Sequence, residues 1–441
     1  MSLTIEQLEE RVADLLAEAK RLGASAADAA VSASAGLTVT VRLGEVETVE
    51  HNRDQGLGVT VYFGHRKGSA STTDLSSAAL KETVAKACSI ARATSEDPCA
   101  GLPDPELMAK DWPDLDLYHP WALSPDEAID IARACEGAAL EFDERITNSE
   151  GATLSTEEGR FVYGNSLGFL GGYPTTRHSL SCVVTGREGD AMQRDWWYDT
   201  RRAAEDLAAP ELIGRRAAER AVARLGARKL ATCEVPVIFR AETAPGLLRS
   251  LIGAIRGHAQ YRESTFLLNA LGERIFPDWV HIHEDPLIPR GLASAPFDNE
   301  GVATRPHDFV REGVLQDYVL DSYSACRLGM RTTGNAGGVR NLAIDSSGQS
   351  LEALLKQMDR GLLVTELMGQ GVNPVTGDYS RGAAGFWVEK GMIQHPVEEV
   401  TVAGNLRDMF QRLVAVGTDT AIPGSIRTGS WLIERMTVAG N

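Results

Sequence analysis

The chain has 441 residues and a formal net charge of −17, with 43% hydrophobic and 24% charged residues. This length allows two domains with separate cores, and the composition is typical of a globular protein. The acidity and the absence of a Lys/Arg-rich run argue against binding to nucleic acid or to an anionic membrane surface. No segment approaches the roughly 18 apolar residues of a membrane span, and no signal-peptide core opens the chain. We therefore expect a cytoplasmic protein.

The first half of the chain alternates predicted strands and helices. It opens with an amphipathic helix. Thr4 and Gln7 form a capping box at the start of this helix, and Gly23 ends it. Strands are predicted at 37–43, 45–50, 57–63, 146–155 and 160–169, and helices at 74–93, from Ser124, and at 210–225. The junction at residues 43–45 predicts a hairpin between the first two strands. This pattern indicates an antiparallel sheet with covering helices.

The second half is richer in strand. Strands are predicted at 235–239, 362–367, 384–389, 392–402 and 431–438, and helices at 245–255, 351–358 and 405–413. We place the boundary where a helix ends near residues 227–232. The fold class is thus α+β in two domains. These are an N-terminal α+β domain, residues 1–228, and a β-rich C-terminal domain, residues 229–441, which we expect to be a sandwich or barrel-like unit.

The six cysteines are widely scattered and include no CxxC pair; they are Cys88, Cys99, Cys135, Cys182, Cys233 and Cys326. Such spacing is typical of free buried thiols in a reducing compartment. We therefore predict six free thiols.

The histidines do not form a recognisable zinc motif. None of the nine belongs to HExxH or HExxxH. The closest pair is His281 and His283, which alternation places on one face of a strand. A metal site and a solvated strand end both fit this pair, and the second is favoured. The sequence therefore predicts no metal on this chain.

Two serines are candidate nucleophiles. Ser166 stands in a Gly-x-Ser-x-Gly pattern, but the hydrolase elbow needs a helix to follow, and residues 169–174 contain Gly-Gly and Pro. Ser380 lies two residues after Asp378. We favour turn or strand roles for both serines over an independent hydrolase. The sequence contains no P-loop and no dinucleotide-binding glycine motif. Residues 334–338 could form an anion-binding nest of backbone amides, but a glycine turn is favoured.

The most distinctive segment is Thr365–Glu389, where five glycines stand among β-branched, aromatic and charged residues. Further characteristic segments include Tyr163-Gly-Asn-Ser-Leu-Gly168, Tyr261-Arg-Glu-Ser-Thr-Phe266 and Thr333-Gly-Asn-Ala-Gly-Gly338, together with residues 94–103, 177–181, 291–298 and 402–406. Over essentially its whole length the sequence resembles the TldD/PmbA family, and within it the PmbA (TldE) branch.

The resemblance implies two related subunits that form a heterodimeric metalloprotease. The TldD-type subunit carries HExxxH on a helix, and a later cysteine completes its zinc site. The aligned positions of this chain hold Arg249, Ser250 and Ala254, and no cysteine follows Cys326. Arginine and alanine cannot bind zinc, and serine cannot replace a carboxylate base. The resemblance therefore implies a subunit without catalytic residues or cofactor, paired with a zinc-bearing TldD-type partner.

The resemblance also implies small or unfolded polypeptide substrates, including antitoxins and precursors of peptide antibiotics. We predict that residues 365–389 border the cleft that an extended peptide follows, because glycine leaves room for a second backbone. The predicted peptide-binding residues are Gly369, Gln370, Gly371, Asp378, Tyr379, Ser380 and Arg381. The competing interpretation is a sharply bent core strand. A different class of function, a homodimeric peptide-binding or chaperone-like protein without protease activity, also stays open.

Overall fold

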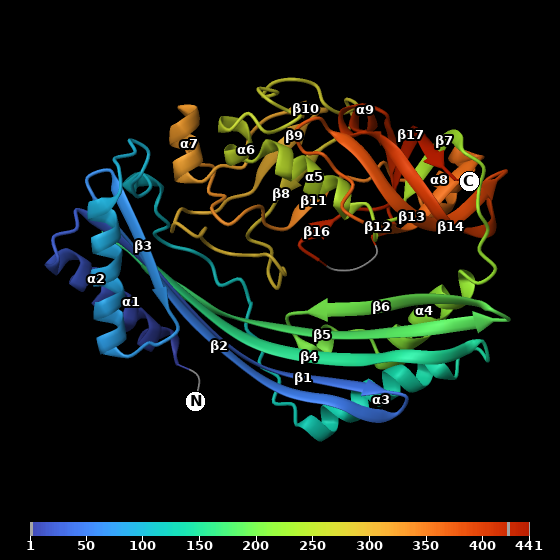
Figure 1. The fold of residues 1–441 in the computed structure, drawn as a ribbon, viewed down its shortest axis with the longest axis horizontal. Helices are drawn as coiled ribbons and strands as arrows, with labels where there is room; N and C mark the ends of the chain where they lie inside the picture. Colours follow the sequence, from blue (N-terminus) through green and yellow to red (C-terminus); the bar gives the residue numbers. More distant parts are fainter. Residues whose placement is uncertain (1–2, 421–423, 441) are drawn as a thin grey trace.

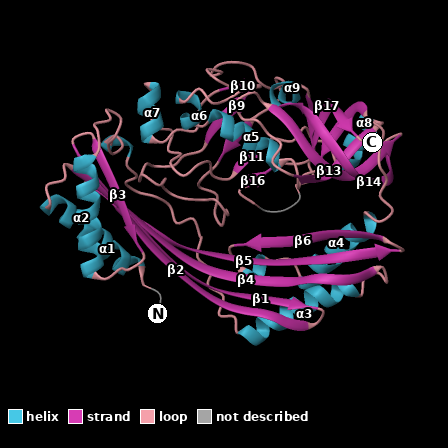
Figure 2. Cartoon of the chain, viewed as in Figure 1, coloured by secondary structure: helices cyan, strands magenta, loops and turns pink. Residues whose placement is uncertain are grey.

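The computed structural model describes residues 3–420 and 424–440. It is an α+β protein, as the sequence predicts. The first half of the chain forms one long curved sheet, and the second half lies above it in the view of Figure 1. The prediction that the second half is richer in strand is wrong, because the long strands of the first half contain more residues than the shorter strands of the second. Helices lie on the outside of the long sheet, and many loops connect the short strands of the second half (Figure 2).

The N-terminal sheet is antiparallel and has the order β3-β2-β1-β4-β5-β6. Its strands are β1 (Ala26–Arg42), β2 (Glu45–Phe63), β3 (Arg66–Thr72), β4 (Ile146–Asn165), β5 (Leu170–Glu188) and β6 (Ala191–Arg201). The hairpin between β1 and β2 is confirmed, with Leu43 and Gly44 at positive φ. The predicted break at 156–159 is wrong. Those residues stay paired with both β1 and β5, so β4 is one strand.

Four helices cover one face of this sheet. They are α1 (Ile5–Arg21), α2 (Ser77–Ala93), α3 (Pro125–Leu140) and α4 (Pro210–Ala223), and the capping boxes at Thr4 and Ser124 are confirmed. Alternate residues of β1 point to the same side. Ala27, Ala29 and Val31 pack in the core beneath α1 and α2, and Leu37, Val39 and Val41 pack in the core beneath α3 and α4. The opposite face of the sheet is therefore turned toward the second half.

The second half contains a closed barrel, which bears out the barrel-like prediction. Its sheet has the order β14-β13-β12-β7-β17-β15, and an additional β14–β17 pairing closes five strands on themselves. The strands are β7 (Cys233–Phe239), β12 (Gly361–Met368), β13 (Asp378–Glu389), β14 (Met392–Asn405), β15 (Leu413–Val416) and β17 (Trp431–Ala439). Phe239, Val402 and Trp431 belong to its fully buried core.

A smaller sheet adjoins the barrel, in the order β10-β9-β8-β11-β16. Its strands are β8 (Ile282–Glu284), β9 (His307–Arg311), β10 (Val314–Leu315), β11 (Leu342–Ile344) and β16 (Ile426–Arg427). The helices of this half are α5 (Pro245–Ile255), α6 (Gly257–Tyr261), α7 (Ser322–Leu328), α8 (Leu351–Met358) and α9 (Leu406–Gln411). Among the described residues, no helix is long and apolar enough to cross a membrane.

The prediction of six free thiols is wrong for one pair, because Cys99 and Cys326 form a disulfide. Contacts between distant segments bring the two residues together. The Tyr323 hydroxyl donates a hydrogen bond to Asp97 at 2.8 Å, which holds the loop before Cys99 against α7. Cys88, Cys135 and Cys182 are free and buried, as predicted, and Cys233 is free and half-buried.

Candidate functional site

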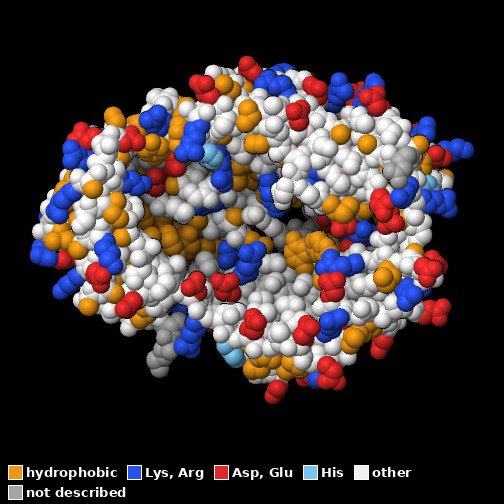
Figure 3. Space-filling view, viewed as in Figure 1, with side chains coloured by type: hydrophobic (Ala, Val, Ile, Leu, Met, Phe, Trp, Pro, Cys, Tyr) orange, Lys and Arg blue, Asp and Glu red, His pale blue; other side chains and the backbone are white. Residues whose placement is uncertain are grey.

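The two halves of the chain meet on both sides of a hollow that is visible in Figure 3. On one side, Arg220 of α4 binds Asp195 of β6 at 3.0 Å and Glu242 of the second half at 2.7 Å. On the other side, Arg202 donates to the carbonyl oxygen of Leu292 at 2.8 Å. Contacts within β6 and directly after it therefore join the sheet to the second half.

The sheet face turned toward the second half carries hydroxyl groups over part of its length, beside an aromatic cluster around Tyr163. Hydroxyl pairs link neighbouring strands, with 3.0 Å between the Oγ atoms of Thr38 and Ser155 and 3.0 Å between the Oγ1 atoms of Thr40 and Thr153. On β6, Trp196 and Tyr198 stack with ring centroids 5.4 Å apart. Hydroxyls and amphipathic rings can form hydrogen bonds without demanding one ligand sequence.

Two neighbouring cavities lie between the halves. The smaller, of about 210 Å³, is lined by Arg177, Tyr198, Glu242 and Arg249 among others. The larger, of about 590 Å³, shares Thr200 and Arg427 with it and adds Arg201, Arg202 and Arg290.

Positive charge predominates in these cavities. The side chains of Arg177, Arg249 and Arg427 are exposed, and no described carboxylate lies within ion-pair distance of them. Burial raises the pKa of the Tyr198 hydroxyl, while Arg249 and Arg177 act on it in the opposite sense. Glu242 is already engaged by Arg220 and Arg240. In a chain of net charge −17, the cavities thus have a locally basic lining.

Helix α5 forms one wall of the smaller cavity. The helix begins with a proline at its first position. Leu247, Leu248 and Leu251 lie on its buried face and pack in the hydrophobic core of the second half. Arg249 projects from the other face into the cavity. The Ser250 hydroxyl donates back to the carbonyl oxygen of Gly246 at 3.1 Å. Ala254 is 2% exposed and belongs to the core, whereas Arg249 is exposed.

Family models match most of the chain. The first, central and C-terminal domains of the PmbA/TldA metallopeptidases match residues 27–91, 118–225 and 232–440. Metalloprotease PmbA of Escherichia coli O157:H7 is 53% identical over 98% of this chain and 96% of its own length.

The chain belongs to the PmbA/TldD family.

Within the family the chain lies in the PmbA branch. The Metalloprotease PmbA homolog of Haemophilus influenzae is 48% identical over 99% of the chain and 97% of its own length. The Metalloprotease TldD homolog of the same species is 22% identical over 82% of the chain and 79% of its own length. A putative modulator of DNA gyrase from Bacteroides thetaiotaomicron superposes with a TM-score of 0.92 at 30% identity, covering 98% of this chain and 99% of the other. TldE from Thermococcus kodakarensis has the same fold, with a TM-score of 0.85 at 24% identity. The match covers 98% of this chain and 100% of the other.

The glycine-rich segment of this PmbA-branch chain is packed against itself. A Cβ atom added at Gly371 would lie 1.5 Å from the carbonyl oxygen of Ser380, and one at Gly385 would lie 1.9 Å from that of Leu363. The Ser380 amide also donates to the Gly371 carbonyl at 2.7 Å. The space that these two glycines leave is therefore filled by the chain's own strands.

The other predicted peptide contacts differ in exposure. Tyr379 is 3% exposed, and burial raises the pKa of its hydroxyl to about 12. Asp378 is exposed but already accepts hydrogen bonds from Thr376 at 2.6 Å and Asn405 at 3.2 Å. Gly369, Gln370 and Ser380 are exposed, and Arg381 is half-buried with a guanidinium nitrogen 4.0 Å from the Cβ position of Gly246 in α5. None of the seven lines the two cavities between the halves.

The candidate serine nucleophiles have ordinary structural surroundings. Ser166 lies in the turn between β4 and β5, and its hydroxyl accepts a hydrogen bond from the Ala27 amide at 3.0 Å. A strand follows it rather than the helix that a nucleophile elbow requires. Ser380 lies on β13 beside Asp378, whose carboxylate is bound to Thr376 and Asn405. Neither serine has a histidine bonded to it among the described residues.

The glycine turn at 334–338 wraps around buried carboxylates of the same chain. The Ala336 amide donates to Asp298 at 3.0 Å, and the Asn335 side chain donates to Glu284 at 2.7 Å. Burial raises the pKa of both carboxyl groups, and the bonds from this turn oppose that shift. The turn thus satisfies internal polar groups, which agrees with the structural role favoured from the sequence.

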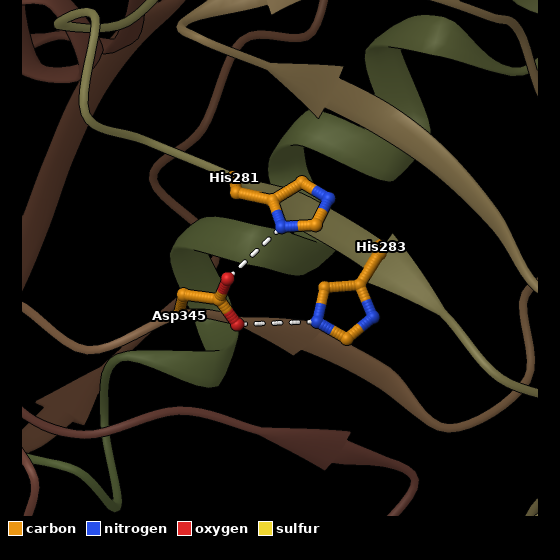
Figure 4. A group of neighbouring side chains, drawn as sticks. All are labelled: His281, His283 and Asp345. Atoms are coloured by element: carbon orange, nitrogen blue, oxygen red, sulfur yellow. Dashed lines mark hydrogen bonds and ion pairs between the residues drawn. The ribbon is translucent and has the colours of Figure 1, made fainter.

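His281 and His283 meet a carboxylate that the sequence did not reveal. In Figure 4 both imidazoles point toward Asp345, with His281 Nδ1 2.9 Å and His283 Nε2 3.2 Å from its oxygens. Partial burial lowers the pKa of His281, but Asp308 and Asp345 outweigh burial and raise it. Asp345 is 62 residues from His283, and only the pairing of β8 with β11 brings them together. No spacing rule in the sequence could have signalled this contact.

Proposed function

We propose that this chain is the non-catalytic subunit of a TldD/TldE-type heterodimeric metalloprotease. It binds unfolded or small polypeptides and guides them to the zinc site of a TldD-type partner that carries HExxxH. The observation that supports the proposal is the sequence of α5, which holds Arg249, Ser250 and Ala254 at the positions where the resemblance to the TldD-type subunit places the metal ligands and the base. Arginine stays cationic, alanine has no donor atom, and serine is a poor base, so this helix does not fit a catalytic zinc ion.

The polar hollow beside α5 supports the peptide-guiding part of the proposal. Its hydroxyl-rich sheet face offers hydrogen bonds to a main chain, which favours broad sequence tolerance. The exposed guanidinium groups of Arg177, Arg249 and Arg427 attract carboxylates of the peptide. We expect acidic stretches and the C-terminal carboxylate of a substrate to be held there.

The glycine-rich segment then has two parts with different roles. Its packed members, Gly371 and Gly385, keep the barrel strands close together. Its exposed members, Gln370, Asp378 and Ser380, remain predicted peptide contacts at the outer surface. We further expect a cytoplasmic protein that binds neither nucleic acid nor membrane, because its negative charge opposes both.

Assembly is the first test of this proposal. The chain and the HExxxH homologue from the same organism are purified separately and examined alone and mixed by size exclusion with light scattering. A one-to-one complex that forms on mixing supports the heterodimer. A stable homodimer that ignores the homologue contradicts it and favours the peptide-binding or chaperone-like alternative.

A further inference from the structure

Three metal-ligating side chains converge at the edge of the smaller sheet of the second half (Figure 4). His281 directly precedes β8, His283 lies in β8, and Asp345 directly follows β11. In the β8–β11 ladder His283 stands opposite Ala343, which places the Asp345 carboxylate beside both rings. The donor atoms of the three side chains all lie within 4.8 Å of one another.

His281 lies between two carboxylates. Its Nε2 atom is 2.7 Å from Asp308, and its Nδ1 atom is 2.9 Å from Asp345. A neutral imidazole that donates its one N–H to Asp308 has a lone pair on Nδ1, which faces Asp345. A metal ion can bind there, between the nitrogen and the carboxylate.

The surrounding geometry matches a metal ion. Zinc bound at about 2 Å in a tetrahedral site holds its ligand atoms about 3.3 Å apart. The two nitrogen–oxygen separations are close to that spacing, although they run to different oxygens: His281 Nδ1 is 2.9 Å from Oδ2 of Asp345, and His283 Nε2 is 3.2 Å from Oδ1. Both carboxylate oxygens therefore face the position of the ion. Asp308 would accept the Nε2–H of His281 and fix its tautomer, which leaves the Nδ1 lone pair free for the ion. This carboxylate–histidine arrangement commonly supports metal ligands.

We propose that His281 Nδ1, His283 Nε2 and the Asp345 carboxylate form a binding site for a divalent transition-metal ion of the zinc class. Two imidazoles and one carboxylate suit zinc or cobalt, whereas magnesium and calcium prefer oxygen ligands alone. The fourth ligand would be water from the adjoining cavity of about 550 Å³, which Glu284 and His307 also line.

The bound ion joins strands that are far apart in sequence. It ties β8 to the end of β11, and through Asp308 it orders β9 as well. The site is separate from α5 in its ligands and does not depend on the proposed peptidase role.

The test is direct metal titration of the full-length chain. Chelator-stripped protein is titrated with Zn²⁺ by calorimetry at pH 7.5, with Mg²⁺ as the hard-ion comparison. Co²⁺ is added in parallel, because its visible absorption reports tetrahedral coordination and thiolate ligands. The variants are His281→Ala and Asp345→Asn. The matched control is His51→Ala, since His51 is exposed on β2.

We expect one Zn²⁺ per wild-type chain, no competition by Mg²⁺, and a tetrahedral Co²⁺ spectrum without a thiolate band. The two ligand variants should bind Zn²⁺ at least 100-fold more weakly, and the control should be unchanged. Asp308→Asn, which alters a positioning residue, should weaken binding about tenfold. Because His281 and Asp345 are 35% and 56% exposed, these variants should keep the wild-type melting temperature without metal. Absence of stoichiometric Zn²⁺ binding, or unchanged affinity in the ligand variants, would overturn the site.

Discussion

The glycine-rich segment and the cavities between the two halves present opposite cases. The segment Thr365–Glu389 is distinctive in the sequence, yet Gly371 and Gly385 are closed off by their own neighbouring strands. The cavities have no local motif, yet they gather Arg177, Arg249 and Arg427 from three distant elements. In this protein the dense glycine pattern therefore indicates close backbone packing. The arginine-lined surface of the cavities, by contrast, forms only where the fold brings distant segments together.

The largest expected effect is that of Gly371→Val. A valine Cβ at this position would overlap the Ser380 carbonyl at 1.5 Å, so β13 must shift. We expect more than about 4 kcal/mol of destabilisation, or failure to fold, measured by denaturant unfolding. Gly382→Ala is the matched control, because its nearest neighbour would be Met368 at 3.4 Å. A folded Gly371→Val protein with impaired peptide binding would restore the view that this glycine leaves room for substrate.

Arg220→Ala tests what holds the cavity walls in place. Arg220, Asp195 and Glu242 have side chains that are 9%, 4% and 7% exposed, so loss of the arginine removes the shorter ion pair of each buried carboxylate. Asp195 keeps Arg224 at 3.4 Å, and Glu242 keeps Arg240 at 3.4 Å. We expect a loss of about 1.5–3 kcal/mol in the free energy of unfolding. Arg216→Ala on the same helix is the control, since its pair with Glu219 is partly exposed and should contribute under about 1 kcal/mol. Equal effects would mean that the network does not hold the halves together.

Arg249→Glu tests the open cavity itself. The side chain is exposed and forms no ion pair among the described residues, so stability should change by under about 0.5 kcal/mol. Cleavage of an acidic peptide by the mixed subunits should fall about tenfold in kcat/KM, equal to about 1.4 kcal/mol. Arg215→Glu makes the same charge change on the exposed side of α4. Equal losses in both variants would indicate a general charge effect rather than a peptide site.

The smallest expected effect is that of Tyr379→Phe. The Tyr379 hydroxyl is buried without a hydrogen-bond partner among the described residues. Its removal should leave cleavage by the mixed subunits unchanged and raise stability by up to about 1 kcal/mol. A marked loss of peptide binding would instead place Tyr379 among the substrate contacts and weaken the contrast between segment and cavity.

Local signals in the sequence predicted local structure well. Thr4 with Gln7 and Ser124 with Glu127 marked helix starts that the structure places at those residues. The wrong break within β4 has a physical cause. Glu157, Glu158 and Gly159 read as a turn, but pairing on both sides with β1 and β5 overrides their low strand preference.

Features that join distant residues could not be predicted in the same way. The Cys99–Cys326 disulfide spans 227 residues, and Asp345 reaches His281 only through the β8–β11 ladder. The position of Arg249 in the cavity is likewise set by the packing of α5 on the barrel core. The loss of zinc ligands at α5 stays a prediction from the sequence, whereas the surface around α5 could be described only from the fold.

The most direct test of the central claim is cleavage of an unfolded peptide by this chain alone, by its HExxxH homologue alone, and by the mixture. Zinc is measured on each sample, with His281→Ala in place of the wild type in a parallel series so that the second site does not confuse the count. We predict activity only in the mixture, with the catalytic zinc on the homologue. Cleavage by this chain alone would contradict the account of a non-catalytic subunit.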